Sequence, residues 1–172
     1  MRYGSVETRT KAITTRRHAA EWAAYAACAW ALAFAALSVY WAAGGTAGAE
    51  TIGEAITKPV LARDPGWVAL LWATGALKTL GGLFALALVQ PWGRGIPRWM
   101  RLSGAWGAGA LMLLYGGASM IQFGLMAAGA LSVPASVGAT AVRWHLLLWE
   151  PWWMLGGVLF MATAWLAGRR GA

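Results

Sequence analysis

The 172-residue chain is too apolar to form the polar surface of a water-soluble globular protein. Hydrophobic residues make up 59% of it and charged residues only 12%, and it contains 13 tryptophans and 23 glycines. Tryptophan is enriched at the ends of membrane helices and glycine within them. The net charge is +8, but the basic residues lie between apolar runs and form no stripe with interleaved aromatics, which excludes nucleic acid as a partner.

No sequence motif indicates an enzyme, a cofactor site or a metal site. The single cysteine, Cys28, lies in an apolar run, where we expect a small buried residue rather than a disulfide or a metal ligand. No glycine-rich phosphate loop, nucleophile elbow or HExxH motif occurs. We therefore predict a chain with no catalytic residue, no cofactor and no metal, and we favour a non-enzymatic role.

The chain begins with a basic, polar tail, residues 1–18, for which we expect disorder. The first transmembrane helix is predicted over about residues 20–43, and its apolar core is too long for a cleaved signal peptide. Small residues repeat at every fourth position of this helix, which favours close helix packing. They are Ala23, Ala27, Ala31 and Ala35.

A longer loop, residues 44–64, follows the first helix. Its apolar residues fall at near-helical spacing, which predicts a short surface helix that covers the end of the bundle. These residues are Ile52, Ala55, Ile56 and Val60. The second transmembrane helix is expected over residues 66–89, with Asp64 as its N-cap and Pro65 in its first turn.

The connection "QPWGRGIPR" contains two prolines and two glycines and predicts a tight turn. The second and third helices should therefore be hairpin neighbours. The third helix is expected over residues 102–130 and the fourth over 145–167. The fold class is all-α, an integral membrane four-helix bundle formed by residues 19–168.

Arginine and lysine residues indicate the orientation. They concentrate in the tail, in the second loop with Arg94, Arg98 and Arg101, and after the fourth helix with Arg169 and Arg170. Cytoplasmic segments of membrane proteins carry an excess of such residues. We therefore predict that both termini face the cytoplasm (N-in/C-in) and that the chain lies in the cell (plasma or inner) membrane.

Three segments of the sequence resemble a known family. They read "YWAAGG", "LKTLGGLFALALVQPWGRGIPR" and "HLLLWEPWWMLGGVLFMATAW". Over about residues 20–168 the chain is similar to an uncharacterised bacterial family of small four-helix membrane proteins, domain of unknown function 3995. The resemblance implies a location and an architecture, but no activity and no site residue.

Lys78 is the ionisable residue that we expect deepest in the bilayer. It lies about 20 Å along the second helix from Pro65, and a lysine at that depth usually faces the bundle interior and has a partner. Its side chain leans toward the outer end, where the fourth helix carries Glu150 next to a proline that should kink it. One interpretation makes Glu150 the partially buried counter-ion of Lys78, in a polar network with Gln122 and His145.

Two other interpretations remain open. In the first, Glu150 caps the last helix at the water boundary within an outer aromatic belt. The belt residues would be Tyr40, Trp41, Trp67, Trp144, Trp149, Trp152 and Trp153. In the second, Lys78 extends toward Gln122 or Ser119 alone.

The sequence favours a multi-pass membrane protein of unknown biochemical role. Its expected partners are the lipid bilayer and another membrane protein, against which it would pack as a non-enzymatic module. The alternative is a small-molecule binding protein or carrier, in which Lys78 and Glu150 form a site that opens to the outer face.

Overall fold

The computed structural model describes residues 3–169 of the chain, and every element assigned there is helical. In chain order they are α1 (Tyr3–Ala42), the 3-10 turn η1 (Ala49–Thr51), α2 (Glu54–Leu61), α3 (Pro65–Ala87), the 3-10 turn η2 (Pro91–Gly95), α4 (Arg98–Ala127), α5 (Gly138–Trp144), the π-helical turn η3 (His145–Trp149) and α6 (Glu150–Gly168). The last three form one continuous helix. Within the described residues, four helices are long and apolar enough to cross a membrane: His18–Ala42, Pro65–Ala87, Arg98–Ala127 and Gly138–Gly168.

Three of the long helices begin at least four residues earlier than the sequence predicted, and one of them is α4, which begins at Arg98 rather than near residue 102. The fourth long helix begins at Gly138 rather than near residue 145. Helix α1 begins at Tyr3, so the expectation of a disordered tail is wrong for residues 3–18. No proline interrupts the tail, and extending an existing helix avoids the cost of starting a new one.

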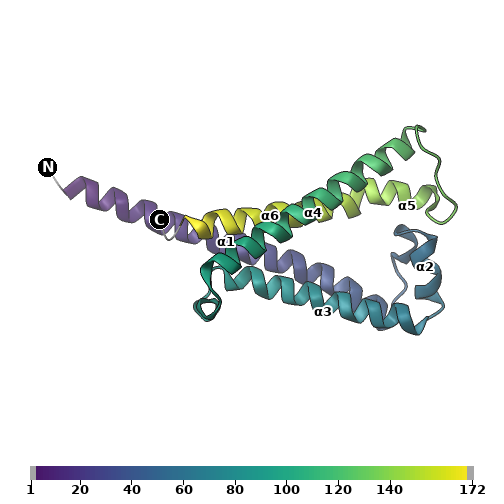
Figure 1. Cartoon of the computed structure of the whole chain (residues 1–172), viewed down its shortest axis with the longest axis horizontal. Coiled ribbons are helices and arrows are strands. Elements are labelled where there is room, and N and C mark those ends of the chain that lie inside the picture. The colour runs from purple at the N-terminus through teal and green to yellow at the C-terminus, as the bar shows by residue number, and fades with distance from the viewer. Residues whose placement is uncertain (1–2, 170–172) are drawn as a thin grey trace.

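The long helices pack as two pairs. Helix α1 packs along α3, α4 packs along α6, and contacts between α1 and α6 join the pairs. Helices α3 and α4 diverge from η2 and meet only near that connection (Figure 1). The prediction that they are hairpin neighbours is therefore wrong beyond this connection. The short turn fixes only where α4 begins, whereas small residues draw α3 toward α1 and α4 toward α6.

Glycine allows the close approach within each pair. A Cβ added at Gly82 of α3 would lie 3.3 Å from the Cβ of Ala31 on α1. Between α4 and α6, a Cβ at Gly109 would lie 2.9 Å from the carbonyl oxygen of Gly157, and the reverse distance is 2.8 Å. Ala27, Ala31 and Ala35 are buried, so the predicted small-residue stripe of α1 is confirmed for these three.

The two ends of the molecule differ in their connections. The N-terminal part of α1, η2 and the end of α6 lie at one end, and η1, α2 and the loop before α5 lie at the other (Figure 1). The predicted start of α3 is confirmed, because the Trp67 N–H donates to the Asp64 carboxylate at 3.0 Å and Pro65 is the first helical residue. Arg63 donates to the carbonyl oxygens of Trp41 and Ala42 and so ties this loop to the end of α1.

Candidate functional site

Aromatic side chains from α1 and from the π turn and α6 form the core between the two helix pairs. The rings of Trp30 and Trp152 stack at 6.1 Å, and Phe34 packs edge-on against Trp153 at 5.1 Å. Gly156 makes room for this cluster, because a Cβ there would lie 2.2 Å from the Trp30 ring. The Trp30 indole N–H also donates to the carbonyl oxygen of Trp152 at 2.9 Å.

This core corrects part of the predicted aromatic belt. Trp41 and Trp149 are buried, and their rings lie 6.0 Å apart within the core. Tyr40 and Trp144 are exposed, as a belt requires. The other three belt candidates, Trp67, Trp152 and Trp153, are half-buried. Sequence spacing could not separate core from belt, because tryptophan suits both environments.

Pro151 shapes the helix beside this core. Its nitrogen carries no hydrogen, and its ring would clash with the carbonyl four residues earlier in a regular helix. The turn before it is wider than an α-turn, and the Glu150 N–H donates to the carbonyl oxygen of His145, five residues back. The predicted disturbance at Glu150 is thus present as a π-helical turn, a feature often found at functional sites.

The wide turn brings the side chains of His145 and Glu150 together. The Nδ1 atom of His145 lies 2.8 Å from Oε1 of Glu150, and its Nε2 atom lies 3.1 Å from the carbonyl oxygen of Ile52. The imidazole stacks on Phe123 of α4, with ring centroids 4.1 Å apart. Glu150 is 1% exposed, and its Oε2 atom has no hydrogen-bond partner among the residues that the structure describes.

This geometry defines the proton content of the pair. The Ile52 carbonyl can only accept, so Nε2 of His145 must carry a hydrogen. One more proton fits between Nδ1 and Oε1, on either atom. Both arrangements give the pair no net charge, which suits an enclosed site because an unpaired buried charge is costly.

The loop between α1 and α3, predicted to cover the end of the bundle, also lies over this site. Besides the contact of Ile52 with His145, the indole N–H of Trp149 lies 3.2 Å from both the carbonyl and the hydroxyl oxygen of Thr51. The short helix expected from the apolar spacing is also present as α2. The loop is thus folded onto the helix end, and the prediction of a cover is confirmed.

Lys78 has a different partner from the predicted one. Its ammonium donates to the Ser38 hydroxyl at 2.8 Å and lies 3.6 Å from the centre of the Phe34 ring. The predicted direct ion pair with Glu150 is therefore wrong, and so is the alternative that Lys78 extends to Gln122 or Ser119. Helix α3 packs along α1, and this places Ser38 of α1 within reach of Lys78.

The remaining predictions about this site also need correction. Glu150 is buried rather than a cap at the water boundary. Gln122 is exposed on α4 and lies outside the buried site. The sequence analysis missed Ser38, although it lies three residues after Ala35 and so on the small-residue face of α1. The contacts that Thr51 and Ile52 make with this site could not be predicted from the neighbouring sequence, because they depend on how the loop folds back onto the helix end.

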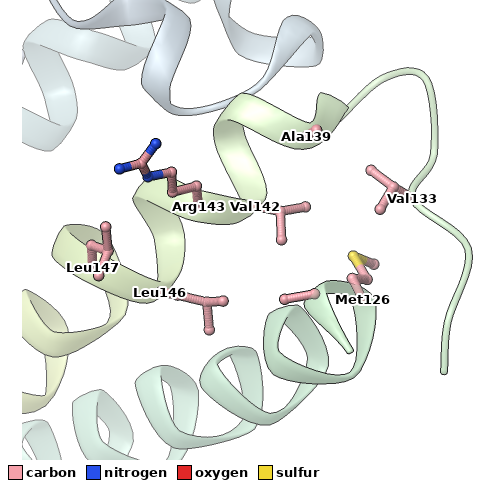
Figure 2. A pocket seen from close by; sticks show the side chains of 8 residues that line it. Met126, Val133, Ala139, Val142, Arg143, Leu146 and Leu147 are labelled. Carbon is pink, nitrogen blue, oxygen red and sulfur yellow. The ribbon is translucent and has the colours of Figure 1, made fainter. Parts of the chain in front are cut away.

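A separate apolar groove lies at the same end of the molecule, between the end of α4 and the start of the last long helix. Its volume is about 510 Å³. Figure 2 shows Met126, Val133 and Val142 directed toward this space, whereas the Arg143 guanidinium points away from them. Neither Lys78 nor Glu150 lines it.

A comparison with family models identifies the chain. A model described as "Protein of unknown function (DUF3995)" matches residues 31–160, a range that includes Ser38, Lys78, His145 and Glu150. Searches of curated proteins and of solved structures found no match. Since the matched range covers most of the sequence, the chain belongs to the DUF3995 family.

Proposed function

We propose that this chain is a multi-pass protein of the cell membrane that acts as a non-enzymatic module, packing against lipid or another membrane protein. Large apolar side chains exposed on its long helices carry the proposal. Those about two-thirds or more exposed are Trp22, Leu77, Trp99, Leu111, Leu114 and Ile121. Exposed apolar surface costs about 25 cal/mol for each Å² in water, a cost that hydrocarbon removes.

The charges support an orientation with both termini in the cytoplasm. Arg94, Arg98 and Arg101 lie at the end of the molecule that also holds both ends of the described chain (Figure 1). At the opposite end, basic residues are offset by the carboxylates of Glu50, Glu54 and Asp64. A surplus of arginine on one side is the usual mark of the cytoplasmic side.

The arrangement of the helices favours a packing role. Helices α3 and α4 each pack along one neighbouring helix and diverge from each other. Apolar residues such as Leu77 on α3 and Leu111 on α4 are therefore left for lipid or for a helix of another protein to cover. The alternative is a carrier with a site formed by Lys78 and Glu150. It is less well supported, because Lys78 already donates a hydrogen bond to Ser38 and Glu150 is already in contact with His145.

Alkaline carbonate washing of membranes from expressing cells tests the membrane proposal. We expect the chain to stay in the pellet after the wash and to be released only by detergent, because four apolar helices would have to leave hydrocarbon. A peripheral protein of the same membranes serves as the control and should be released. Recovery of the chain in the carbonate supernatant would contradict the proposal.

A further inference from the structure

Three arginines surround a second cavity, at the end of the molecule that holds η2. Its volume is about 240 Å³, and Arg94, Arg98 and Arg101 line it together with the apolar side chains of Leu88 and Leu102. No carboxylate lines the cavity, and no ion pair involves these arginines within residues 3–169. The cavity therefore concentrates positive charge that the described protein does not neutralise.

The three arginines differ in how many hydrogen bonds they donate within the protein. Arg101 donates to the carbonyl oxygens of Ile96 and Ala87, at 3.1 and 2.9 Å, and so holds η2 against the end of α3. Arg98 donates to the carbonyl oxygen of Gly168. Arg94 is exposed and has no hydrogen-bond partner in the described part of the chain. Arg94 and the remaining N–H groups of the other two arginines are available to an anion.

Helix α4 starts beside the same cavity, which Arg98 and Arg101 of this helix line. The N-cap residue is Pro97, which supplies no side-chain cap, and the first turn contains no acidic residue. The first backbone N–H groups of a helix attract anions when no side chain caps them. Helix α4 starts at Arg98, so its positive end coincides with the arginine cavity.

Two exposed tryptophans indicate the depth of this cavity. Trp92 lies two residues before Arg94, Trp99 directly follows Arg98, and they are 58% and 71% exposed. Exposed tryptophan side chains of membrane proteins favour the headgroup region. The cavity also combines a polar side with the apolar Leu88 and Leu102, so it suits a molecule with an anionic head and an apolar tail.

We propose that this cavity binds the phosphate group of an anionic phospholipid in the cytoplasmic leaflet. The inference rests on the proposed membrane location. Arg94, Arg98 and the N–H groups at the start of α4 bind the phosphate, and Leu88 and Leu102 contact the start of the acyl chains. Arginine suits this role because its planar guanidinium donates two parallel hydrogen bonds to phosphate oxygens.

Lipid binding to the full chain, purified in an uncharged detergent, tests the proposal. The probes are dioctanoyl phosphatidylglycerol, dioctanoyl phosphatidylcholine and inorganic phosphate. We expect the dissociation constant for phosphatidylglycerol to be lower than that for phosphatidylcholine by at least about tenfold. The Arg94→Gln/Arg98→Gln variant should bind phosphatidylglycerol about 30-fold more weakly, given the contribution of each basic residue to binding anionic lipid.

Two further variants keep this test decisive. Arg94→Gln alone removes no internal hydrogen bond and should weaken binding about fivefold even if the double variant folds poorly. Arg143→Gln makes the same charge change on an exposed residue at the opposite end and should leave binding within about twofold of the wild type. Unchanged binding by the arginine variants, or equal affinity for phosphatidylcholine, would overturn the proposal.

Inorganic phosphate separates the two sources of the anion. If it binds as tightly as phosphatidylglycerol, the site takes a soluble anion and the lipid assignment is wrong. The proposed function fails in a different experiment, because carbonate washing reports on the apolar helices and not on these arginines. A chain that stays in the washed membrane but does not distinguish the two lipids would overturn only the lipid site.

Discussion

Replacing His145 with leucine is expected to destabilise the protein by about 3 to 5 kcal/mol, the usual cost of removing one partner from a buried charged pair. In the His145→Leu variant both carboxyl oxygens of Glu150 lack a partner, since Oε2 already has none in the described structure. Chemical unfolding in detergent, followed by circular dichroism, measures the change in the free energy of unfolding.

A double-mutant cycle separates this pair from the one that the sequence suggested. The His145→Leu/Glu150→Leu variant should recover most of the lost stability, because it leaves no buried polar group without a partner. Losses from Lys78→Met and Glu150→Leu should instead add to within about 0.5 kcal/mol, as for residues without shared partners. Strong coupling of Lys78 with Glu150, and none of His145 with Glu150, would reverse our assignment.

The second large effect is expected at the contact between α4 and α6. In the Gly109→Ala variant the new Cβ would lie 2.9 Å from the backbone oxygen of Gly157 and 2.5 Å from Met161 Cγ. A backbone atom cannot move aside without separating the helices, so we expect a loss of about 1 to 3 kcal/mol. The same unfolding measurement in detergent determines it.

Gly107 provides a matched control on the same helix. A Cβ added there meets nothing within 4 Å. The Gly107→Ala change should therefore be neutral or stabilise the protein by up to about 1 kcal/mol, because alanine favours helix more than glycine does. Equal losses from the two substitutions would show that the contact between Gly109 and Gly157 does not limit helix packing.

Local sequence signals predicted the parts of the fold that local interactions determine. Asp64 and Pro65 mark the start of α3 because a cap and a first-turn proline act within one helical turn. The spacing of Ile52, Ile56 and Val60 predicted α2. Local signals do not predict which helices pair, because pairing depends on how glycine-containing helix faces far apart in the sequence fit together. Depth along the helix could not identify the partner of Lys78, because it did not show that α3 packs along α1, where Ser38 lies.

The candidate site likewise contains features that local sequence predicts and contacts that it does not. Glu150 and His145 were both chosen from the sequence, since ionisable residues among apolar ones are costly unless they have partners. The sequence placed them in one polar network but did not predict their direct contact, because that contact spans five residues, whereas a regular helix brings together residues three or four apart. Only the π-helical turn before Pro151 makes that contact, and its exact form does not follow from the proline alone.

In the proposed orientation the end that holds η2 and its arginines faces the cytoplasm, and the end that holds η1 and α2 faces outward. Accessibility of single cysteines in intact cells tests it, in a Cys28→Ala background that removes the natural thiol. Gly95 in η2 has free space for a side chain, and Ser132 is exposed in the loop before α5. A membrane-impermeant maleimide should label the Ser132→Cys variant in intact cells and the Gly95→Cys variant only after lysis; labelling of Gly95→Cys in intact cells would contradict the account.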